Sequence, residues 1–220
     1  MRLDIFERHV QCLINKIPRD LSTVDLQNLF FQLAIDITTE FLFGESTNIL
    51  ASSARSEQQN FNIAFDLAQA EIARRSRFGS FPWIYETKNF NRARKTVHAF
   101  IDAYVHKALN NRKEFDDRDN KINRNGFEGY IFLNELAQRT HDPKRIRDEL
   151  LNILLAGRDT TAGLLSHTFH VLARRPDIWS ILKAEVDQLQ GRKPDYESLR
   201  NMTYLKYLIN ECKFLPHLYN

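Results

Sequence analysis

The segment between Pro143 and Pro176 has helical periodicity and no internal proline, and it constrains the fold more than any other feature of the sequence. Asp142 is a favourable N-cap residue, and a proline directly after it fits the first turn of a helix. We therefore predict one helix over about residues 143–174, roughly 48 Å long at 1.5 Å per residue. Helices in globular proteins average about 11–12 residues, and this segment lacks the heptads of a coiled coil. Such a helix is expected to cross the interior of a domain.

The remaining sequence also favours helices. The chain has only 7 glycines and 6 prolines in 220 residues, so it has few of the turn residues that a β-rich fold needs. Apolar residues recur at helical spacing in several segments, with cap signals at their ends. The expected helices are residues 3–17 ended by Pro18, Asp25 to Gly44, a Ser56/Gln59 capping box through Ile72, Val97–Ala108, Pro176 to Leu189 closed by Gly191, and a helix capped by Thr203.

Between these segments, Phe81-Pro82 is a predicted break, residues 110–129 a predicted solvated loop, and Tyr130–Leu136 a short apolar segment. The expected fold class is therefore all-α.

Charge and cysteine content exclude several functions. The formal net charge is only +3 and dispersed, which argues against a nucleic-acid partner. Cys12 and Cys212 lie far apart and form no zinc or disulfide pattern, so no metal site is expected from them. No apolar run reaches the ~18 residues of a membrane span, and Met1–Glu7 does not resemble the start of a signal peptide. We therefore expect no membrane anchor in this chain.

The middle of the long helix has an unusual composition. Ala156–Gly163 contains two glycines, two threonines and an aspartate, which together disfavour a helix by roughly 3–4 kcal/mol relative to alanine. Gly157 leaves a notch, and threonine hydroxyls can bond to the carbonyl one turn earlier and bend the helix. A notch with a hydroxyl and a carboxylate is suited to holding water and moving a proton. The alternative is that Gly157 and Gly163 allow another helix to approach closely.

Helical geometry divides this helix into two faces. At 100° per residue, the notch residues Gly157, Thr160 and Thr161 share a face with most of the apolar residues. That apolar set is Ile146, Leu150, Ile153, Leu154, Leu164 and Val171, and the opposite side carries Leu151, Leu155, Ala162 and Phe169. The helix is thus expected to be buried on most sides of its middle.

The sequence Ala156-Gly157-Arg158-Asp159-Thr160-Thr161 resembles the central-helix motif of the cytochrome P450 haem-thiolate monooxygenases, Ala/Gly-Gly-x-Asp/Glu-Thr-Thr/Ser. The segments 150–155 and 171–177 on either side of it are also similar to this family. Segments 24–31 and 39–46 are similar to fungal members that hydroxylate alkanes and fatty acids. The chain is therefore identified as a partial P450 domain over residues 1–212.

This resemblance implies haem as cofactor, electrons from NADPH through NADPH–cytochrome P450 reductase, and an apolar small-molecule substrate. It assigns Thr160 to proton relay and Asp159 as its acidic partner. Ala156 and Gly157 leave space for oxygen and substrate, and Thr161 supports a local helix distortion. Full-length relatives are located at the endoplasmic reticulum membrane. The compartment of this chain stays open, the cytoplasm being one alternative.

The sequence also departs from the family pattern. The motif F-x-x-G-x-R-x-C-x-G, which carries the axial cysteine, does not occur in it. Glu211 matches the structural glutamate of E-x-x-R, but Phe214 stands where the arginine belongs. Residues 213–220 are therefore expected to be a non-homologous tail.

Without the axial motif, the side chains that could bind iron have ordinary interpretations. Cys12 and Cys212 are expected to be buried small hydrophobes, and His167 and His170 ordinary, partly buried histidines. The chain alone is expected to be an inactive part of a haem-dependent monooxygenase. The alternative is a non-catalytic helical fragment or interaction module.

A third hypothesis is a nucleic-acid or membrane-surface binder. It would use basic residues near predicted helix ends: Arg74, Arg75, Arg77, Arg92, Arg94 and Lys95. A solvated helix face explains these charges more simply.

Overall fold

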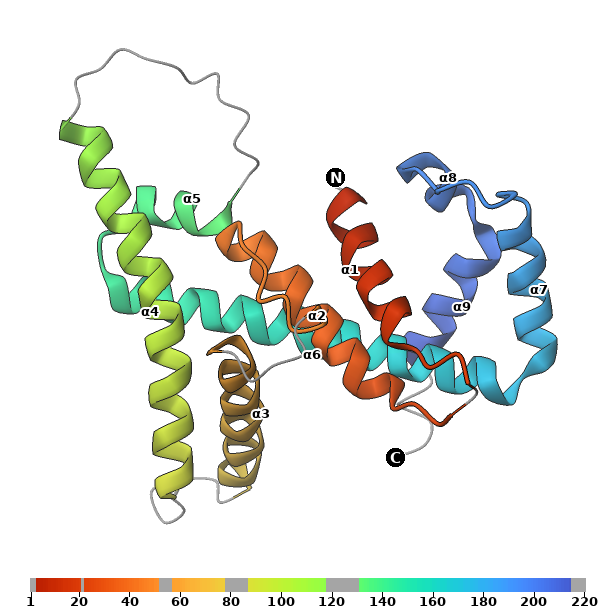
Figure 1. The fold of residues 1–220 in the computed structure, drawn as a ribbon, viewed down its shortest axis with the longest axis horizontal. Helices are drawn as coiled ribbons and strands as arrows, with labels where there is room; N and C mark the ends of the chain where they lie inside the picture. Colours follow the sequence, from red (N-terminus) through yellow and green to blue (C-terminus); the bar gives the residue numbers. More distant parts are fainter. Residues whose placement is uncertain (1–2, 21, 52–56, 78–86, 118–130, 215–220) are drawn as a thin grey trace. The chain divides into compact units, whose positions relative to one another are not determined.

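The computed structural model describes residues 3–20, 22–51, 57–77, 87–117 and 131–214, with the side chains of 111–117 and 214 left out. Within these ranges every regular element is a helix, as the all-α prediction requires (Figure 1). The helices are α1 (Leu3–Lys16), α2 (Leu26–Phe43), α3 (Glu57–Ser76), α4 (Lys88–Asp117), α5 (Phe132–Arg139), α6 (Pro143–Arg174), α7 (Pro176–Asp187), α8 (Tyr196–Asn201) and α9 (Thr203–Phe214). In the described part of the chain, no helix is both long and apolar enough to cross a bilayer.

The long central helix is confirmed, because α6 runs without interruption from Pro143 to Arg174. Its start is capped as predicted: the Asp142 carboxylate accepts the backbone N–H of Lys144 at 3.0 Å and that of Arg145 at 3.4 Å. Asp25 caps α2 in the same way, accepting the Asn28 N–H at 3.1 Å. These caps involve residues close together in the sequence, so local pattern was enough to predict them.

The chain divides into two compact units. One comprises Met1–Ile37 with Ala156–Asn220, and the other comprises Thr38–Leu155, so α2 and α6 contribute to both.

The core of unit Thr38–Leu155 is aromatic. The rings of Phe61 and Phe100 stack with centroids 4.1 Å apart, and Tyr104 lies 5.4 Å from Phe100 and 4.6 Å from Phe43. This stack joins the end of α2 to α3 and α4. Burial, and after it the charge of Glu45, raises the pKa of the Tyr104 phenol.

The predicted basic surface lies in the same unit and is partly engaged within it. The guanidinium groups of Arg75 and Arg94 lie 4.7 and 5.8 Å from the centroid of the Phe90 ring. Arg74 pairs with Glu71 at 3.0 Å. Interactions of this kind fit a helix face whose charges serve the fold.

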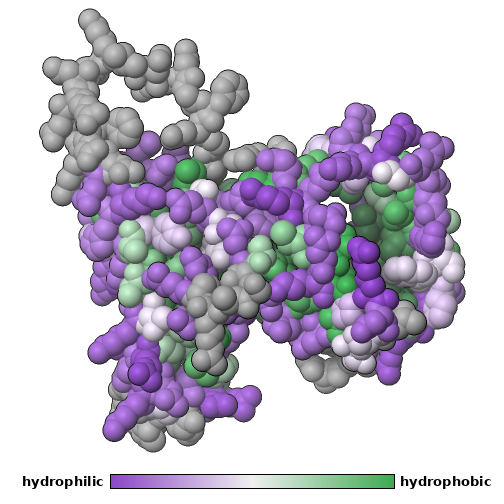
Figure 2. All heavy atoms as spheres, viewed as in Figure 1, coloured by the Kyte–Doolittle hydropathy of each residue, from purple (hydrophilic) through white to green (hydrophobic). Residues whose placement is uncertain are grey.

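The core of the other unit joins α6, α7 and α9. Its buried members are Leu172, Leu208 and Cys212, and Leu164, Val171, Ile178 and Leu182 pack against them. Large apolar side chains also remain exposed on this unit, including Phe6, Val10, Ile14, Trp179, Ile181 and Val186. In Figure 2 hydrophobic residues are green, and green patches are visible on the face of the molecule that it shows.

Helix α1 buries only part of its apolar stripe, which consists of Leu3, Phe6, Val10, Leu13, Ile14 and Ile17. His9 and Leu13 are buried, whereas Phe6, Val10 and Ile14 are exposed. The expectation that Cys12 is buried is likewise wrong, because it is only half-buried. Periodicity located the stripe but did not reveal which side of the helix the neighbouring elements cover.

Several helix limits also differ from the predictions. Helix α4 continues to Asp117, so the predicted loop does not begin at residue 110. Once a helix is nucleated, adding polar residues to it is easy, and charge alone does not end it. Helix α7 ends at Asp187, with turn residues before Gly191, and the short helix α8 was not predicted. Ser56 and the Phe81-Pro82 break lie outside the described residues.

We expect Gly44→Ala to destabilise the chain more than Gly191→Ala. Both glycines have left-handed φ values, +76° and +73°, which cost a residue with a Cβ about 1–2 kcal/mol. A Cβ at Gly44 would also lie 2.6 Å from Cδ1 of Ile131, whereas nothing lies within 4 Å at Gly191. Urea unfolding should therefore show about 1 kcal/mol of additional loss for Gly44→Ala. Equal losses would contradict the steric account.

Candidate active site

The central octet remains helical and carries the expected backbone contact. The hydroxyl of Thr160 donates to the carbonyl oxygen of Ala156, one turn earlier, at 2.7 Å. Ala156, Thr160 and Thr161 are all exposed, and Asp159 is half-buried. One side of the octet is therefore open, in keeping with a notch that admits a small molecule.

The prediction that α6 is buried on most sides of its middle is wrong. The buried residues follow a four-residue spacing through Ile146, Leu150, Leu154, Arg158 and Ala162. Ala162, predicted on the opposite side from the main apolar face, is fully buried, whereas Leu155 and Phe169 are 42% and 39% exposed. Residues four apart form a continuous ridge on a helix, and such a ridge is what neighbouring elements cover.

A pocket of about 510 Å³ opens beside the notch. Helix α6 contributes Asp159, Thr160, Thr161, Gly163, Leu164, Leu165 and His167, and α9 contributes Cys212 and Lys213. A Cβ built at Gly163 meets no atom within 4 Å, so no helix packs closely there. This excludes close helix packing as the explanation for Gly163. Asp159 and Thr160, the predicted carboxylate and hydroxyl residues, thus line the same cavity.

Sequence reasoning missed Arg158. Arg158 is only 3% exposed. Its guanidinium carbon lies 4.6 Å from the centroid of the Phe31 ring, and its Nη1 lies 3.2 Å from Oδ1 of Asp159. The four-residue spacing of Leu150, Leu154 and Ala162 was the one signal that could have placed this arginine on the buried ridge.

Helix α9 is held in place by a carboxylate from α7. Oε1 and Oε2 of Glu185 accept the backbone N–H groups of Tyr204 and Leu205, each at 2.9 Å. The prediction that Thr203 caps this helix is therefore wrong, since its hydroxyl donates to the Asn201 carbonyl instead. The partner is 19 positions away in the sequence, so no local pattern could indicate it.

The remaining candidate residues occupy varied positions. Cys212 is buried as predicted, at 1% exposure. His167 is half-buried, and its Nε2 has no hydrogen-bond partner among the described residues. His170 and Glu211 are exposed. Within the ranges that the structure covers, no three His, Cys, Asp or Glu residues are grouped to hold a metal ion.

Comparison with known proteins identifies the family. The family model "Cytochrome P450" matches residues 3–212. The chain belongs to the cytochrome P450 family. This confirms the resemblance that the central-helix motif indicated.

Among P450 relatives, cytochrome P450 52A12 of Debaryomyces hansenii is 41% identical over 93% of this chain and 42% of its own length. Cytochrome P450 monooxygenase himC of Aspergillus japonicus is 42% identical over 95% of this chain and 38% of its own length. The solved haem domain of cytochrome P450DA has a TM-score of 0.74 at 17% identity, covering 95% of this chain and 44% of that one. The chain thus spans about two fifths of the length of the relatives it matches.

The open space beside Gly163 and the apolar lining suit one face of a haem, and the axial cysteine motif of the family does not occur in the sequence. Gly163 leaves space for a flat ring, and Leu164 and Leu165 give the wall an apolar surface. The axial cysteine motif is absent from the 220 residues, and Cys212, the cysteine at this pocket, is packed in the core around Leu172 and Leu208. The described residues therefore supply a wall and no axial ligand in the family motif.

We expect Glu185→Gln to loosen the α9 side of the pocket. The substitution replaces one accepting oxygen with an N–H donor and removes the negative charge that stabilises a helix N-terminus. The free energy of unfolding should therefore fall by about 1–2 kcal/mol. Urea unfolding and amide exchange at Tyr204 and Leu205 measure the effect. Asp187→Asn, which removes an exposed ion pair with Lys183, is the control. It should leave the free energy of unfolding and the amide exchange at Tyr204 and Leu205 unchanged. Unchanged exchange in Glu185→Gln would contradict the capping role.

Proposed function

We propose that this chain contributes the oxygen-facing wall of a haem-dependent monooxygenase that hydroxylates an apolar chain such as a fatty acid or alkane. The observation that carries the proposal is that Asp159 and Thr160 line the same pocket as Gly163 and two leucines. A proton-handling pair and an apolar surface thus meet in one cavity. The resemblance of segments 24–31 and 39–46 to fungal hydroxylases supports the substrate class.

The hydrogen bond of Thr160 defines how the pair can handle a proton. Because its O–H donates to the Ala156 carbonyl, the Thr160 oxygen keeps its acceptor capacity for a water in the pocket that this residue lines. The Asp159 carboxyl group can also accept a hydrogen bond, so a water between the two residues would donate one proton to either of them and keep its second proton free to be passed on. The Asp159 side chain is 41% exposed, which allows it to exchange protons with solvent. Asp159 would collect the proton, and Thr160 would position the water that carries it.

Four further residues complete the proposed assignment. Ala156 and Gly157 keep the oxygen side of α6 open, and Thr161 supports the local helix geometry. Glu211 keeps its structural assignment from the E-x-x-R resemblance.

Haem held by a cysteine thiolate supplies the chemistry of dioxygen cleavage. Electrons would come from NADPH through NADPH–cytochrome P450 reductase. The endoplasmic reticulum membrane is the proposed location of full-length relatives, and the compartment of this chain stays open between that membrane and the cytoplasm.

For the 220 residues alone we propose that catalysis does not occur, because their sequence lacks the axial cysteine motif. That same absence favours the alternative, a non-catalytic helical fragment. Residues 213–220 keep their interpretation as a non-homologous tail, of which 215–220 lie outside the described part of the chain.

A haem titration tests both parts of the proposal. The purified chain is titrated with haem, reduced and exposed to carbon monoxide, with and without a small alkyl thiol that can serve as axial ligand. We expect a thiolate-type Soret band only when the thiol is added. A band without added thiol would contradict the inactive-alone proposal, and no haem binding under either condition would contradict the haem-facing wall.

Gly163→Leu provides the matched test of the pocket. It replaces a helical glycine where nothing lies within 4 Å, so the fold should be retained or stabilised by up to about 1 kcal/mol. The added side chain fills the pocket, and haem affinity should fall by about tenfold or more. Ala173→Leu, on the exposed surface of α6 and outside the pocket lining, should leave affinity unchanged. Equal affinities of the two variants would place haem elsewhere.

A further inference from the structure

The buried guanidinium of Arg158 is the least expected feature of the candidate site. Its side chain is 4% exposed, yet it belongs to the same octet as the open pocket wall. A charged group is buried only when polar or electrostatic partners compensate for the lost water. The interactions of Arg158 therefore indicate what keeps it there.

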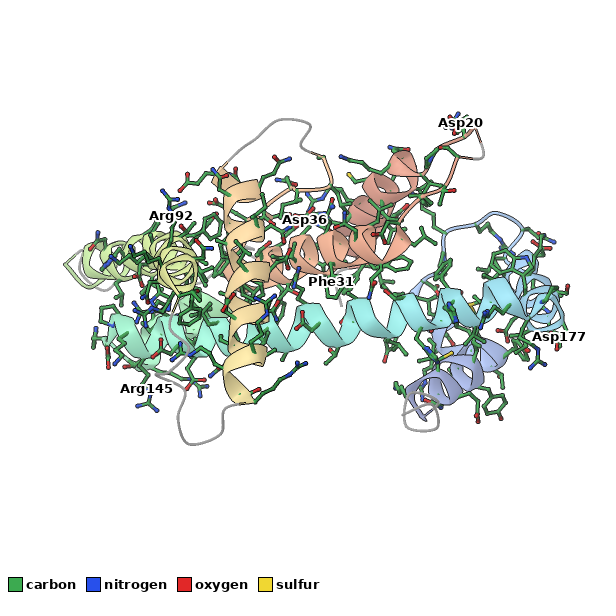
Figure 3. All side chains as sticks on the ribbon, turned by 90° about the horizontal axis from the view of Figure 1, so that it is seen from below. Asp20, Phe31, Asp36, Arg92, Arg145 and Asp177 are labelled. Atoms are coloured by element: carbon green, nitrogen blue, oxygen red, sulfur yellow. The ribbon has the colours of Figure 1, made fainter. Side chains whose placement is uncertain are left out.

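One of these interactions is with an aromatic ring on α2. The Arg158 guanidinium carbon lies 4.6 Å from the centroid of the Phe31 ring, within the range of a cation–π interaction. Figure 3 labels Phe31 on α2, beside α6. A planar guanidinium on a ring loses little of its hydrogen-bonding ability, because its N–H groups point outward in its own plane.

A second interaction is with the carboxylate of Asp159, a residue that lines the pocket. Nη1 of Arg158 lies 3.2 Å from Oδ1 of Asp159, whose side chain is 41% exposed. Neighbouring residues on a helix point about 100° apart, so the two side chains meet only where one turns toward the other. The buried and fixed member of this pair is the arginine, and the exposed member is the carboxylate.

We propose that Arg158, held on the ring of Phe31, is a positioning residue that fixes the Asp159 carboxylate at the edge of the pocket. The proposal rests on the proposed role of Asp159 in proton delivery. A half-buried aspartate on a helix, without a fixed partner, can adopt several rotamers, and only some of them point toward the pocket. A charge-assisted hydrogen bond to a fixed partner selects one rotamer. Arg158 and Phe31 thereby act on proton delivery through Asp159, without lining the pocket themselves.

The experiment measures the χ1 rotamer of Asp159 directly, in the full chain and without haem. Three-bond couplings from its side-chain carboxyl carbon to the backbone nitrogen and carbonyl carbon report the rotamer populations. We expect one dominant rotamer in the unaltered chain. In Arg158→Met and in Phe31→Leu the couplings should average over the staggered rotamers.

Arg175→Met is the matched control, because it removes a different arginine–aspartate pair, with Asp177 at 2.6 Å, at the start of α7. It should leave the couplings of Asp159 unchanged. Phe31→Leu keeps an apolar side chain at a half-buried site and is therefore expected to fold. If Arg158→Met does not fold, the Asp159 couplings in Phe31→Leu test the proposal.

Two results would overturn the proposal. The first is that the Asp159 couplings are already averaged over several rotamers in the unaltered chain. The second is that Asp159 keeps a single rotamer in Phe31→Leu or in a folded Arg158→Met. A purely structural role for Arg158 would lower the unfolding midpoint and leave the Asp159 rotamer intact. The measurement needs no haem, so failure of the haem titration and failure of this proposal are distinguishable.

Discussion

Helix α6 has to bury one ridge and leave another side open within the same few turns, and the rest of the candidate site depends on this division. The buried ridge passes through Arg158 and Ala162, and the open side presents Asp159, Thr160 and Gly163 to the pocket. Every residue of an α-helix has a fixed direction relative to its neighbours. Covering the ridge therefore determines which side chains face the cavity. The unfavourable helix propensity of the octet is offset by packing on the ridge, since tertiary contacts supply most helical stability.

The pocket is lined by residues of α6 and α9, and different interactions position these two helices. The α6 wall is positioned by the buried ridge and by the stacking of Arg158 on Phe31. The α9 wall is positioned by the Glu185 carboxylate at its N-terminus and by Cys212 and Leu208 in the core. The cavity thus depends on two charged side chains that do not line it. Both make hydrogen bonds that use the charge, which are the stronger kind in proteins.

Local sequence patterns predicted the features that local interactions decide. The all-α class and the extent of α6 follow from helical periodicity between prolines, and the caps at Asp25 and Asp142 follow from residues within one helical turn. The motif Ala156–Thr161 identified the family, and the back-bond of Thr160 follows from its place in a helix. The features that were missed depend on distant partners: Phe31 for Arg158, and Glu185 for the start of α9. Only part of the apolar stripe of α1 is buried, because a stripe does not reveal which of its residues the neighbouring elements cover.

The central claim is that the open side of α6 accepts a flat, apolar, iron-containing ring. The most direct measurement is paramagnetic broadening of methyl and amide signals when ferric haem is added to the isotope-labelled chain. The account predicts that the methyl signals of Thr160 and Thr161 and the amide signal of Gly163 broaden first, while Ala173 on the same helix stays sharp. Broadening that begins at the exposed apolar residues of α1, with Thr160 and Gly163 unaffected, would contradict it.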